Sequence, residues 1–257
     1  MDFARGTGGD YRSPRLSIGW ARHADEVAEA QRLRWRVFAE EQKASITSPV
    51  PGLDIDSFDA HCEHLIVRNE RTGEVVGTYR VLTGAAARRI GGFYSDQEFD
   101  LSRLDRLRDQ AVEIGRSCVH PAHRNGATIA LLWSGLAELM MRGPYDVMIG
   151  CASIPVGDGG HAAASIYARA ARTSLSADEH RVFPRNPLPL RELDASRTTV
   201  PPALIKGYLR SGAFICGAPH WDREFNTADL LMMLQLSRLE ARYAQHFLKT
   251  STGRQAA

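Results

Sequence analysis

The feature that most constrains the fold is a run in which strand-like and helix-like apolar patterns alternate. Residues 111–119 have the pattern of a strand, and Pro121 and Gly126 then interrupt the chain. Residues 129–141 form a strongly apolar helical segment, and residues 145–152 are almost wholly apolar. An apolar strand of that kind is typical of the centre of a sheet, where both faces are buried. The run therefore predicts a sheet with a helix packed on it.

The flanking segments extend this sheet. Residues 24–42 carry apolar positions at helical spacing, and residues 64–69 and 75–82 form a predicted hairpin around Gly73. Further predicted elements are a short helix at 101–108, helices at 161–172 and 203–210, strands near 213–217 and 229–236, and a last helix ending near residue 248. This order predicts a mixed α/β (α+β) fold, with a central mixed sheet and helices on both faces.

The rest of the chain is assigned by composition. Residues 1–20 are predicted as a flexible lead-in, and residues 21–250 as a single domain with a Pro-rich C-terminal extension from about residue 173. The net charge of only +2 argues against a nucleic-acid binder. The four cysteines form no Cys-x-x-Cys pair, there is no secretory signal, and no apolar stretch reaches the about 20 residues that span a bilayer. A cytoplasmic protein is expected, with peripheral contact to the inner face of the membrane left open.

Charged residues gather in three places before residue 111. The first predicted helix carries Arg34, Arg36 and Phe38, which taken alone fit an ordinary amphipathic helix. An acidic turn at 54–59 could hold a cation or be simply solvated, and its spacing matches no known metal-ligand pattern. Arg80 lies in an otherwise apolar strand, where a cation usually faces solvent or pairs with a carboxylate.

The most specific cluster is the segment from residue 111 to residue 124. Glu113 and Arg116 lie on a strand that ends at a break before a helix, and such a break leaves backbone N–H groups free to bind an anion or a thioester oxygen. Cys118, His120 and His123 lack a fourth partner, so no metal site is predicted.

These segments together resemble the ornithine-lipid-type L-ornithine N(alpha)-acyltransferases, a GNAT-like family often labelled haemolysins. The same skeleton is similar to that of acyl-homoserine-lactone synthases. The segments that carry the resemblance are 33–38, 56–59, 77–82, 91–101, 113–121, 149–153, 204–210 and 225–230. The resemblance implies the GNAT-like acyl-CoA N-acyltransferase fold. It also implies transfer of a (3-hydroxy)fatty acyl group from acyl carrier protein to the α-amine of ornithine or a similar amino acid, which gives lyso-ornithine lipid.

One segment departs from the pattern of acetyl-CoA-dependent members. Their phosphate loop has small residues where the backbone approaches the pyrophosphate, whereas here the register from Arg124 places Ala127 and Ile129 at those positions. This favours a phosphopantetheine arm on a carrier protein over CoA, with no separate cofactor.

The resemblance also assigns roles. Glu113 is predicted to be the general base acting through water, with Arg116 beside it and Tyr167 either the general acid or a core tyrosine. Backbone amides of Cys118 and Val119 are predicted to bind the oxyanion. Arg34, Arg80 and Arg116 are candidates to bind the acceptor carboxylate, and Asp56 or Asp59 would bind its second ammonium group. The predicted substrate-binding residues are Arg34, Arg36, Phe38, Asp56, Asp59, Arg80, Cys118, Val119 and Arg124.

The remaining expectations concern the acyl chain and the partner. Phe93, Phe99, Leu132, Trp133 and Met148 could line an apolar tunnel, and direct attack without an acyl-enzyme is favoured. Arginines 88 and 89, or 169 and 172, could dock an acidic carrier protein. The alternatives are an autoinducer synthase that acylates S-adenosylmethionine, an acetyl-CoA acetyltransferase, and a non-catalytic carrier-binding or haemolysin-like membrane-active protein.

Overall fold

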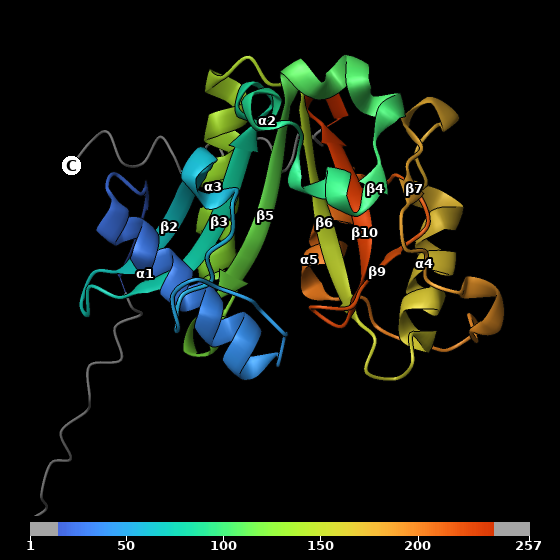
Figure 1. The fold of residues 1–257 in the computed structure, drawn as a ribbon, viewed down its shortest axis with the longest axis horizontal. Helices are drawn as coiled ribbons and strands as arrows, with labels where there is room; N and C mark the ends of the chain where they lie inside the picture. Colours follow the sequence, from blue (N-terminus) through green and yellow to red (C-terminus); the bar gives the residue numbers. More distant parts are fainter. Residues whose placement is uncertain (1–14, 239–257) are drawn as a thin grey trace, which may run out of the picture.

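A mixed eight-stranded sheet organises residues 15–238, the part of the chain that this computed structural model describes (Figure 1). Its strands follow the order β1-β2-β3-β5-β6-β10-β8, and β9 also pairs with β10. The strand bounds are β1 Leu16–Trp20, β2 Glu63–Asn69, β3 Val75–Thr83, β5 Ala111–Val119, β6 Val147–Pro155, β8 Phe214–Ile215, β9 His220–Asp222 and β10 Thr227–Gln235. Only β5 and β6 run parallel among these pairs. A separate antiparallel pair joins β4 (Phe99–Asp100) to β7 (Phe183–Pro184).

Helices cover both faces of the large sheet. The helix bounds are α1 Ala24–Trp35, followed directly by a π-helical turn at Arg36–Glu41, then α2 Gly84–Ile90, α3 Ala127–Arg142, α4 His161–Ser174 and α5 Ala203–Arg210. Apolar side chains of α3 and α5 share one hydrophobic cluster with the sheet, and those of α1 and α2 pack against the sheet in two further clusters. Along β6, Met148 packs with the α3 cluster while Val147 and Ile149 pack with the α2 cluster, so the predicted central strand is buried on both faces.

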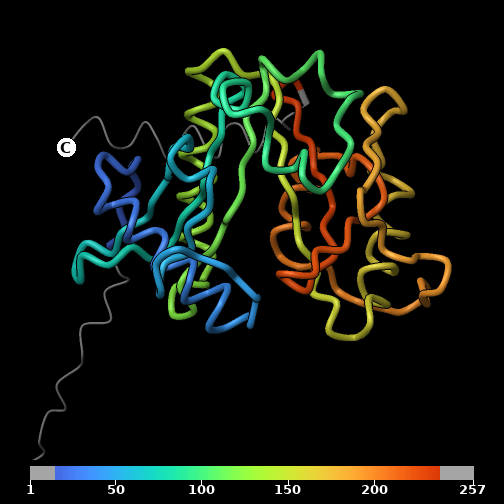
Figure 2. Tube along the Cα trace, viewed as in Figure 1, coloured from blue at the N-terminus to red at the C-terminus, as the bar shows by residue number. Residues whose placement is uncertain are grey.

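The parallel strands β5 and β6 stay together for only part of their length. Their pairing covers Ala111–Glu113 against Val147–Ile149, and beyond it the two strands separate (Figures 1 and 2). Arg116 has a left-handed backbone with φ of 47°, and the register between β3 and β5 shifts beside it. A bulge of this kind bends and twists the strand that contains it. The bulge therefore lies at the point where β5 turns away from its neighbour.

Most of the predicted elements are confirmed, including strand 111–119 and helix 203–210 to the residue. The flexible lead-in is wrong for Leu16–Trp20, which pair with β2 as an edge strand. Helix α2 was not predicted, although Thr83 caps its first turn by accepting from Ala86 N and Gly91 ends it in the left-handed conformation that glycine favours. The last predicted helix lies beyond residue 238, outside the described residues. Within residues 15–238, no helix combines the length and apolarity needed to cross a bilayer.

The junction of β5 and β6 leaves no room for a side chain at Gly150. A Cβ atom there would collide with the Ile114 backbone oxygen and lie 3.1 Å from Ile114 Cγ1. We expect Gly150→Ala to lower the free energy of unfolding by about 1–3 kcal/mol, because overpacking displaces backbone. Urea denaturation measures the change. Gly19→Ala on β1, where a Cβ meets nothing within 4 Å, is the matched control, and equal losses in both variants would contradict the packing argument.

Candidate active site

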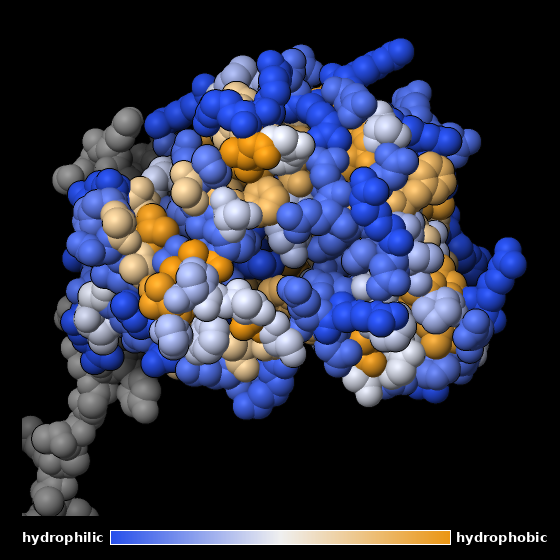
Figure 3. Space-filling model, in the orientation of Figure 1, coloured by the Kyte–Doolittle hydropathy of each residue, from blue (hydrophilic) through white to orange (hydrophobic). Residues whose placement is uncertain are grey.

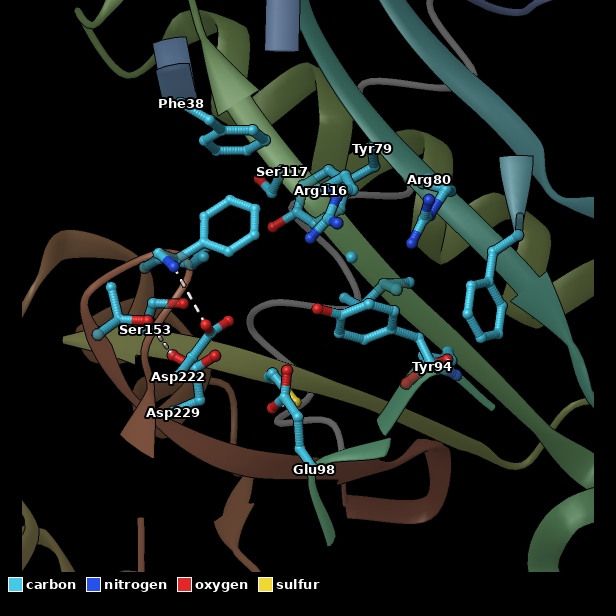
Figure 4. A pocket seen from close by; sticks show the side chains of 18 of the residues that line it. Phe38, Tyr79, Arg80, Tyr94, Glu98, Arg116, Ser117, Ser153, Asp222 and Asp229 are labelled. Atoms are coloured by element: carbon cyan, nitrogen blue, oxygen red, sulfur yellow. Dashed lines mark hydrogen bonds between the residues drawn. The ribbon is translucent and has the colours of Figure 1, made fainter. Parts of the chain in front are cut away.

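A cavity of about 410 Å³ opens where β5 and β6 separate. Its walls come from elements that are distant in the sequence (Figure 4). They include Glu113–Ser117 of β5, Cys151 and Ser153 of β6, Thr227 and Asp229 of β10, and the side chains of Arg80, Tyr94, Glu98, Tyr208 and Asp222. Arg116 and Arg80 lie on one side, while Glu98, Asp222 and Asp229 lie on the other. The cavity thus has a cationic wall and an anionic wall.

The cationic wall rests on a buried ion-pair network. Arg34 is fully buried, and its guanidinium donates to Asp54 Oδ2 at 2.8 Å and to both oxygens of Asp59 at 2.9 and 2.8 Å. Arg80 Nη1 contacts Asp56 at 2.6 Å and Asp59 at 3.2 Å. Although burial opposes it, bonding to Arg34 holds the pKa of Asp59 well below its usual range. Arg34 and Asp59 therefore form a buried ion pair with each other, and neither side chain lines the cavity.

Arg116 is the arginine that this network holds most loosely. Its nearest carboxylate oxygens, on Asp54 and Asp56, are 3.4 and 3.3 Å away, and its Nε has no hydrogen-bond partner in the described part of the chain. The guanidinium lies over the rings of Tyr94 and Phe225, 5.1 and 4.7 Å from their centres. A guanidinium held between aromatic rings keeps donors free for a planar anion. Arg116 is the residue best placed to bind a substrate carboxylate.

Glu113 lines the cavity, but its carboxylate is already occupied. It accepts hydrogen bonds from Tyr94 N at 2.6 Å, Ser95 N at 2.8 Å and Ser95 Oγ at 2.5 Å. Burial raises its pKa, and these three bonds oppose the rise. A carboxylate engaged by three donors is poorly placed to take a further proton. The geometry of Glu113 fits a residue that positions the Tyr94 loop rather than the predicted base.

The anionic wall is formed by Glu98, Asp222 and Asp229, which were not predicted as site residues. One oxygen from each lies within 4.8 Å of the others, an arrangement that suits a cation. Glu98 and Asp229 are 5% and 4% exposed. Burial and the Asp222 carboxylate raise the pKa of Asp229 to about 6, and burial and Asp229 raise the pKa of Glu98 well above its ordinary value. The sequence did contain one indication of this wall, because Asp229 is a single carboxylate in an otherwise apolar strand.

The thiols near the cavity are protonated. Burial raises the pKa of Cys62 to about 12 and that of Cys151 well above its ordinary value, and both line the cavity. The pKa of Cys118 also rises to about 12, and this side chain packs in the α1 cluster instead. Because the thiolate is the reactive form, none of the three is activated as a nucleophile.

Backbone amides of β5 face the gap between the strands. Amides alternate in direction along a strand. The His120 amide donates to a carbonyl of β3 at 2.9 Å, and Cys118 pairs with Thr78 of the same strand. The Cys118 amide therefore points toward β3, so the register favours Ser117 and Val119 as the donors that face β6, in place of the predicted pair Cys118 and Val119.

Arg36, Arg124 and Tyr167 also lie away from the cavity. Arg36 is exposed and pairs with Glu74. Arg124 is held by Glu41 through contacts of 2.6 and 2.7 Å. Tyr167 packs against the core from α4, which supports the alternative interpretation of a core tyrosine.

The other predicted residues divide between the cavity and the core. Phe38 lines the cavity and contacts Phe225, and Asp56 supports both Arg80 and Arg116. Of the predicted tunnel residues, Trp133 and Met148 line a separate apolar cavity of about 50 Å³, whereas Phe93, Phe99 and Leu132 are buried in the core.

Comparison with known proteins places the chain among acyltransferases. Residues 33–134 match the acetyltransferase (GNAT) domain. The chain is 36% identical to the L-ornithine N(alpha)-acyltransferase of Rhizobium meliloti (strain 1021), over 92% of this chain and 85% of the relative. It is 34% identical to the protein of that name from Agrobacterium fabrum, over 90% and 85%. A structure of the CoA-dependent acyl-homoserine lactone synthase BjaI shares the fold, with a TM-score of 0.55 at 13% identity over 92% of this chain and 89% of that one.

The buried network predicts very different costs for two neighbouring arginines. Arg34→Ala removes the shortest ion pairs of the buried Asp54 and Asp59 and leaves them the longer contacts to Arg116 and Arg80, and we expect a loss of about 3–5 kcal/mol in the free energy of unfolding. Arg36→Ala removes an exposed pair with Glu74 and should cost less than about 1 kcal/mol. Urea denaturation of both variants measures the difference. Similar losses would show that the network does not stabilise the fold.

Proposed function

The chain belongs to the L-ornithine N(alpha)-acyltransferase family, and on this premise we propose that it transfers a fatty acyl group from acyl carrier protein to the α-amine of ornithine. It is an N-acyltransferase with a GNAT domain. The observation that carries the proposal is the two-sided charge of the cavity between β5 and β6, with Arg116 facing Glu98, Asp222 and Asp229.

The charge pattern of the cavity matches the acceptor. Ornithine has one carboxylate and two ammonium groups at neutral pH. Arg116 offers a guanidinium fork for the carboxylate, and the anionic wall offers carboxylates for the ammonium groups. A neutral amino acid would leave part of the buried negative charge uncompensated, which is unfavourable in a site of low polarity.

The donor end of the site supports a carrier-bound thioester. The amides of Ser117 and Val119 face the gap between the strands and could bind the developing oxyanion. Arg124, which stands where CoA-dependent members approach the pyrophosphate, is instead engaged by Glu41 and by the Val119 oxygen at 3.0 Å. A phosphopantetheine arm on a protein requires no pyrophosphate site, so this occupation of Arg124 favours the carrier protein as donor.

The surface is compatible with a charged partner. Hydrophilic residues predominate on the face seen in Figure 3, including the region over α2. Arg169 donates to the backbone oxygens of Arg197 and Thr199, so it is committed to the fold. Arg88 pairs with Asp109. Among residues 15–238, the exposed Arg89 bonds to Ala85 of its own helix and the exposed Arg172 makes no ion pair, so these two remain the predicted docking candidates.

The proposed transfer proceeds by direct attack. The cavity thiols are protonated, so the acceptor nitrogen attacks the thioester carbon without an acyl-enzyme. The experiment combines purified protein with acyl carrier protein bearing a 3-hydroxyacyl chain and a panel of amino acids, with mass spectrometry of the products. We expect an amide of ornithine. Use of acyl-CoA with no use of the carrier protein would reject the proposed donor, and an amide of a neutral amino acid alone would reject the proposed acceptor.

The role assigned to Arg116 is tested by kinetics. Arg116→Ala should raise KM for ornithine at least about tenfold, because a charge-assisted bond to the carboxylate contributes about 1.5–3 kcal/mol. Arg116→Lys should restore only part of the affinity for ornithine, since a lysine ammonium cannot form a bidentate pair with a carboxylate. Arg142→Ala, an exposed residue of α3 paired with Glu138, is the control. An unchanged KM in Arg116→Ala would remove the residue from the acceptor site.

A further inference from the structure

Asp229 lies where the reaction needs a proton acceptor. We propose that Asp229, with Glu98 as its proton-sharing neighbour, is the general base that deprotonates the α-ammonium of the acceptor. The inference deepens the proposed function and rests on it. It assigns the base to β10 and to the residue before β4, and leaves Glu113 on β5 as a positioning residue.

Asp229 is held rigidly in the wall of the cavity. It pairs with Ser153 across β6 and β10, and its Oδ1 accepts a hydrogen bond from Thr227 Oγ1 at 2.9 Å. All three of these residues line the cavity. The carboxylate is therefore fixed on the anionic wall, across the cavity from Arg116 (Figure 4). A substrate carboxylate on Arg116 would direct the rest of the acceptor toward this wall.

The two groups of carboxylates in the protein differ in their partners. Asp54, Asp56 and Asp59 each contact an arginine within 3.4 Å. Within residues 15–238, Glu98 and Asp229 make no ion pair, and the hydrogen-bond donor to the Glu98 side chain is the Cys151 thiol at 3.1 Å. A buried carboxylate without a cation is unstable as an anion, so it is free to exchange a proton. The fold therefore pairs the carboxylates of residues 54–59 with arginines and leaves those of Glu98 and Asp229 able to exchange protons.

The surroundings of Asp229 set the pH at which it works. The groups that face it are Asp222 and His220 on β9, Cys151 and Ser153 on β6, Arg116 and Glu113 on β5, Thr227 on its own strand, and Glu98. Burial and Asp222 raise the pKa of Asp229 to about 6, so most molecules hold it as carboxylate at neutral pH. Burial and the neighbouring Asp229 carboxylate raise the pKa of Glu98 well above its ordinary value, so the two buried carboxyl groups influence each other's protonation. A base with a pKa near the working pH is the most effective.

The proton transfer is balanced as follows. Asp229 takes one proton from the α-ammonium, and the nitrogen lone pair then forms the C–N bond at the thioester carbon. The C–S bond breaks with its electron pair on sulfur, and the second proton lost by the nitrogen reaches the thiolate to give the carrier thiol. Asp229 returns its proton to solvent. The products are the amide, the free carrier thiol and one proton, and no further reactant is required.

The experiment compares Asp229→Asn, Glu98→Gln and Glu113→Gln by the pH dependence of kcat/KM for ornithine in the presence of EDTA. In the wild type we expect the rate to fall at acid pH with an apparent pKa near 6. Asp229→Asn should lower kcat by about 10²–10⁴-fold, with a smaller rise in KM because Asp222 and Glu98 still face the ammonium groups. Its residual rate should rise with pH as free amine accumulates, an effect that a structural role would not produce. Glu98→Gln removes an ionisable carboxyl group beside Asp229, so the fall in kcat/KM at acid pH should move to lower pH.

Folding is controlled separately. Because the folded pKa of Asp229 is raised above the unfolded value near 3.9, its protonated carboxyl group stabilises the fold at low pH, and this contribution is lost as the pH rises through about 6. Asp229→Asn should therefore keep or raise Tm at pH 7.5. Asp105→Asn, an exposed carboxylate beside Arg108, is the matched control with unchanged rate.

Three results would overturn the assignment. The first is that the fall in rate at acid pH disappears in Glu113→Gln but persists in Asp229→Asn. The second is that Asp229→Asn keeps the wild-type kcat. The third is that EDTA abolishes the activity and Mg²⁺ restores it. Failure of the proposed function looks different, because the wild-type protein would then form no ornithine amide from any donor.

Discussion

The structure depends on the buried bond between the Arg34 guanidinium and the carboxylates of Asp54 and Asp59. This bond ties α1 to the acidic segment that precedes β2, and that segment in turn supports Arg80 and Arg116 on two neighbouring strands. Buried charges persist only when they are paired in good geometry, so the network holds these elements in one arrangement. Arg116, at the edge of the network and in a left-handed bulge, faces the cavity together with Arg80 and is the less tightly paired of the two.

Charge in this protein is organised in two different ways on the two sides of one cavity. On the β3 and β5 side, arginines and aspartates neutralise one another, and the pKa of Asp59 is held low. On the β10 side, Glu98 and Asp229 are buried and form no ion pair with any residue from 15 to 238, and burial raises their pKa values. The first arrangement stabilises the fold, while the second gives groups that can exchange protons. The separation of β5 from β6 places these two environments face to face.

The sequence predicted most of the fold and several of the residues that line the cavity. Strand 111–119 and helix 203–210 have periodic patterns and clear breaks, which are local signals, and both were located to the residue. The arginine and aspartate motifs came from a family resemblance, which indicated that they act together but not which member faces the substrate. Arg34 is internal to the network and Arg116 reaches the cavity, although both were assigned the same role. Glu113 matched the motif, yet its carboxylate is taken up by the Tyr94 loop.

The residues that were missed lie far apart in the chain and have no local pattern in common. Glu98 precedes a two-residue strand, Asp222 ends β9 and Asp229 lies within β10, and only the sheet order brings them together beside β6. By itself, the sequence determined the elements, the family and the types of charge available, because periodicity, turns and motifs are encoded locally. The tertiary structure alone decided which charges are paired and which remain exposed to the cavity, because pairing and burial depend on strand order and register.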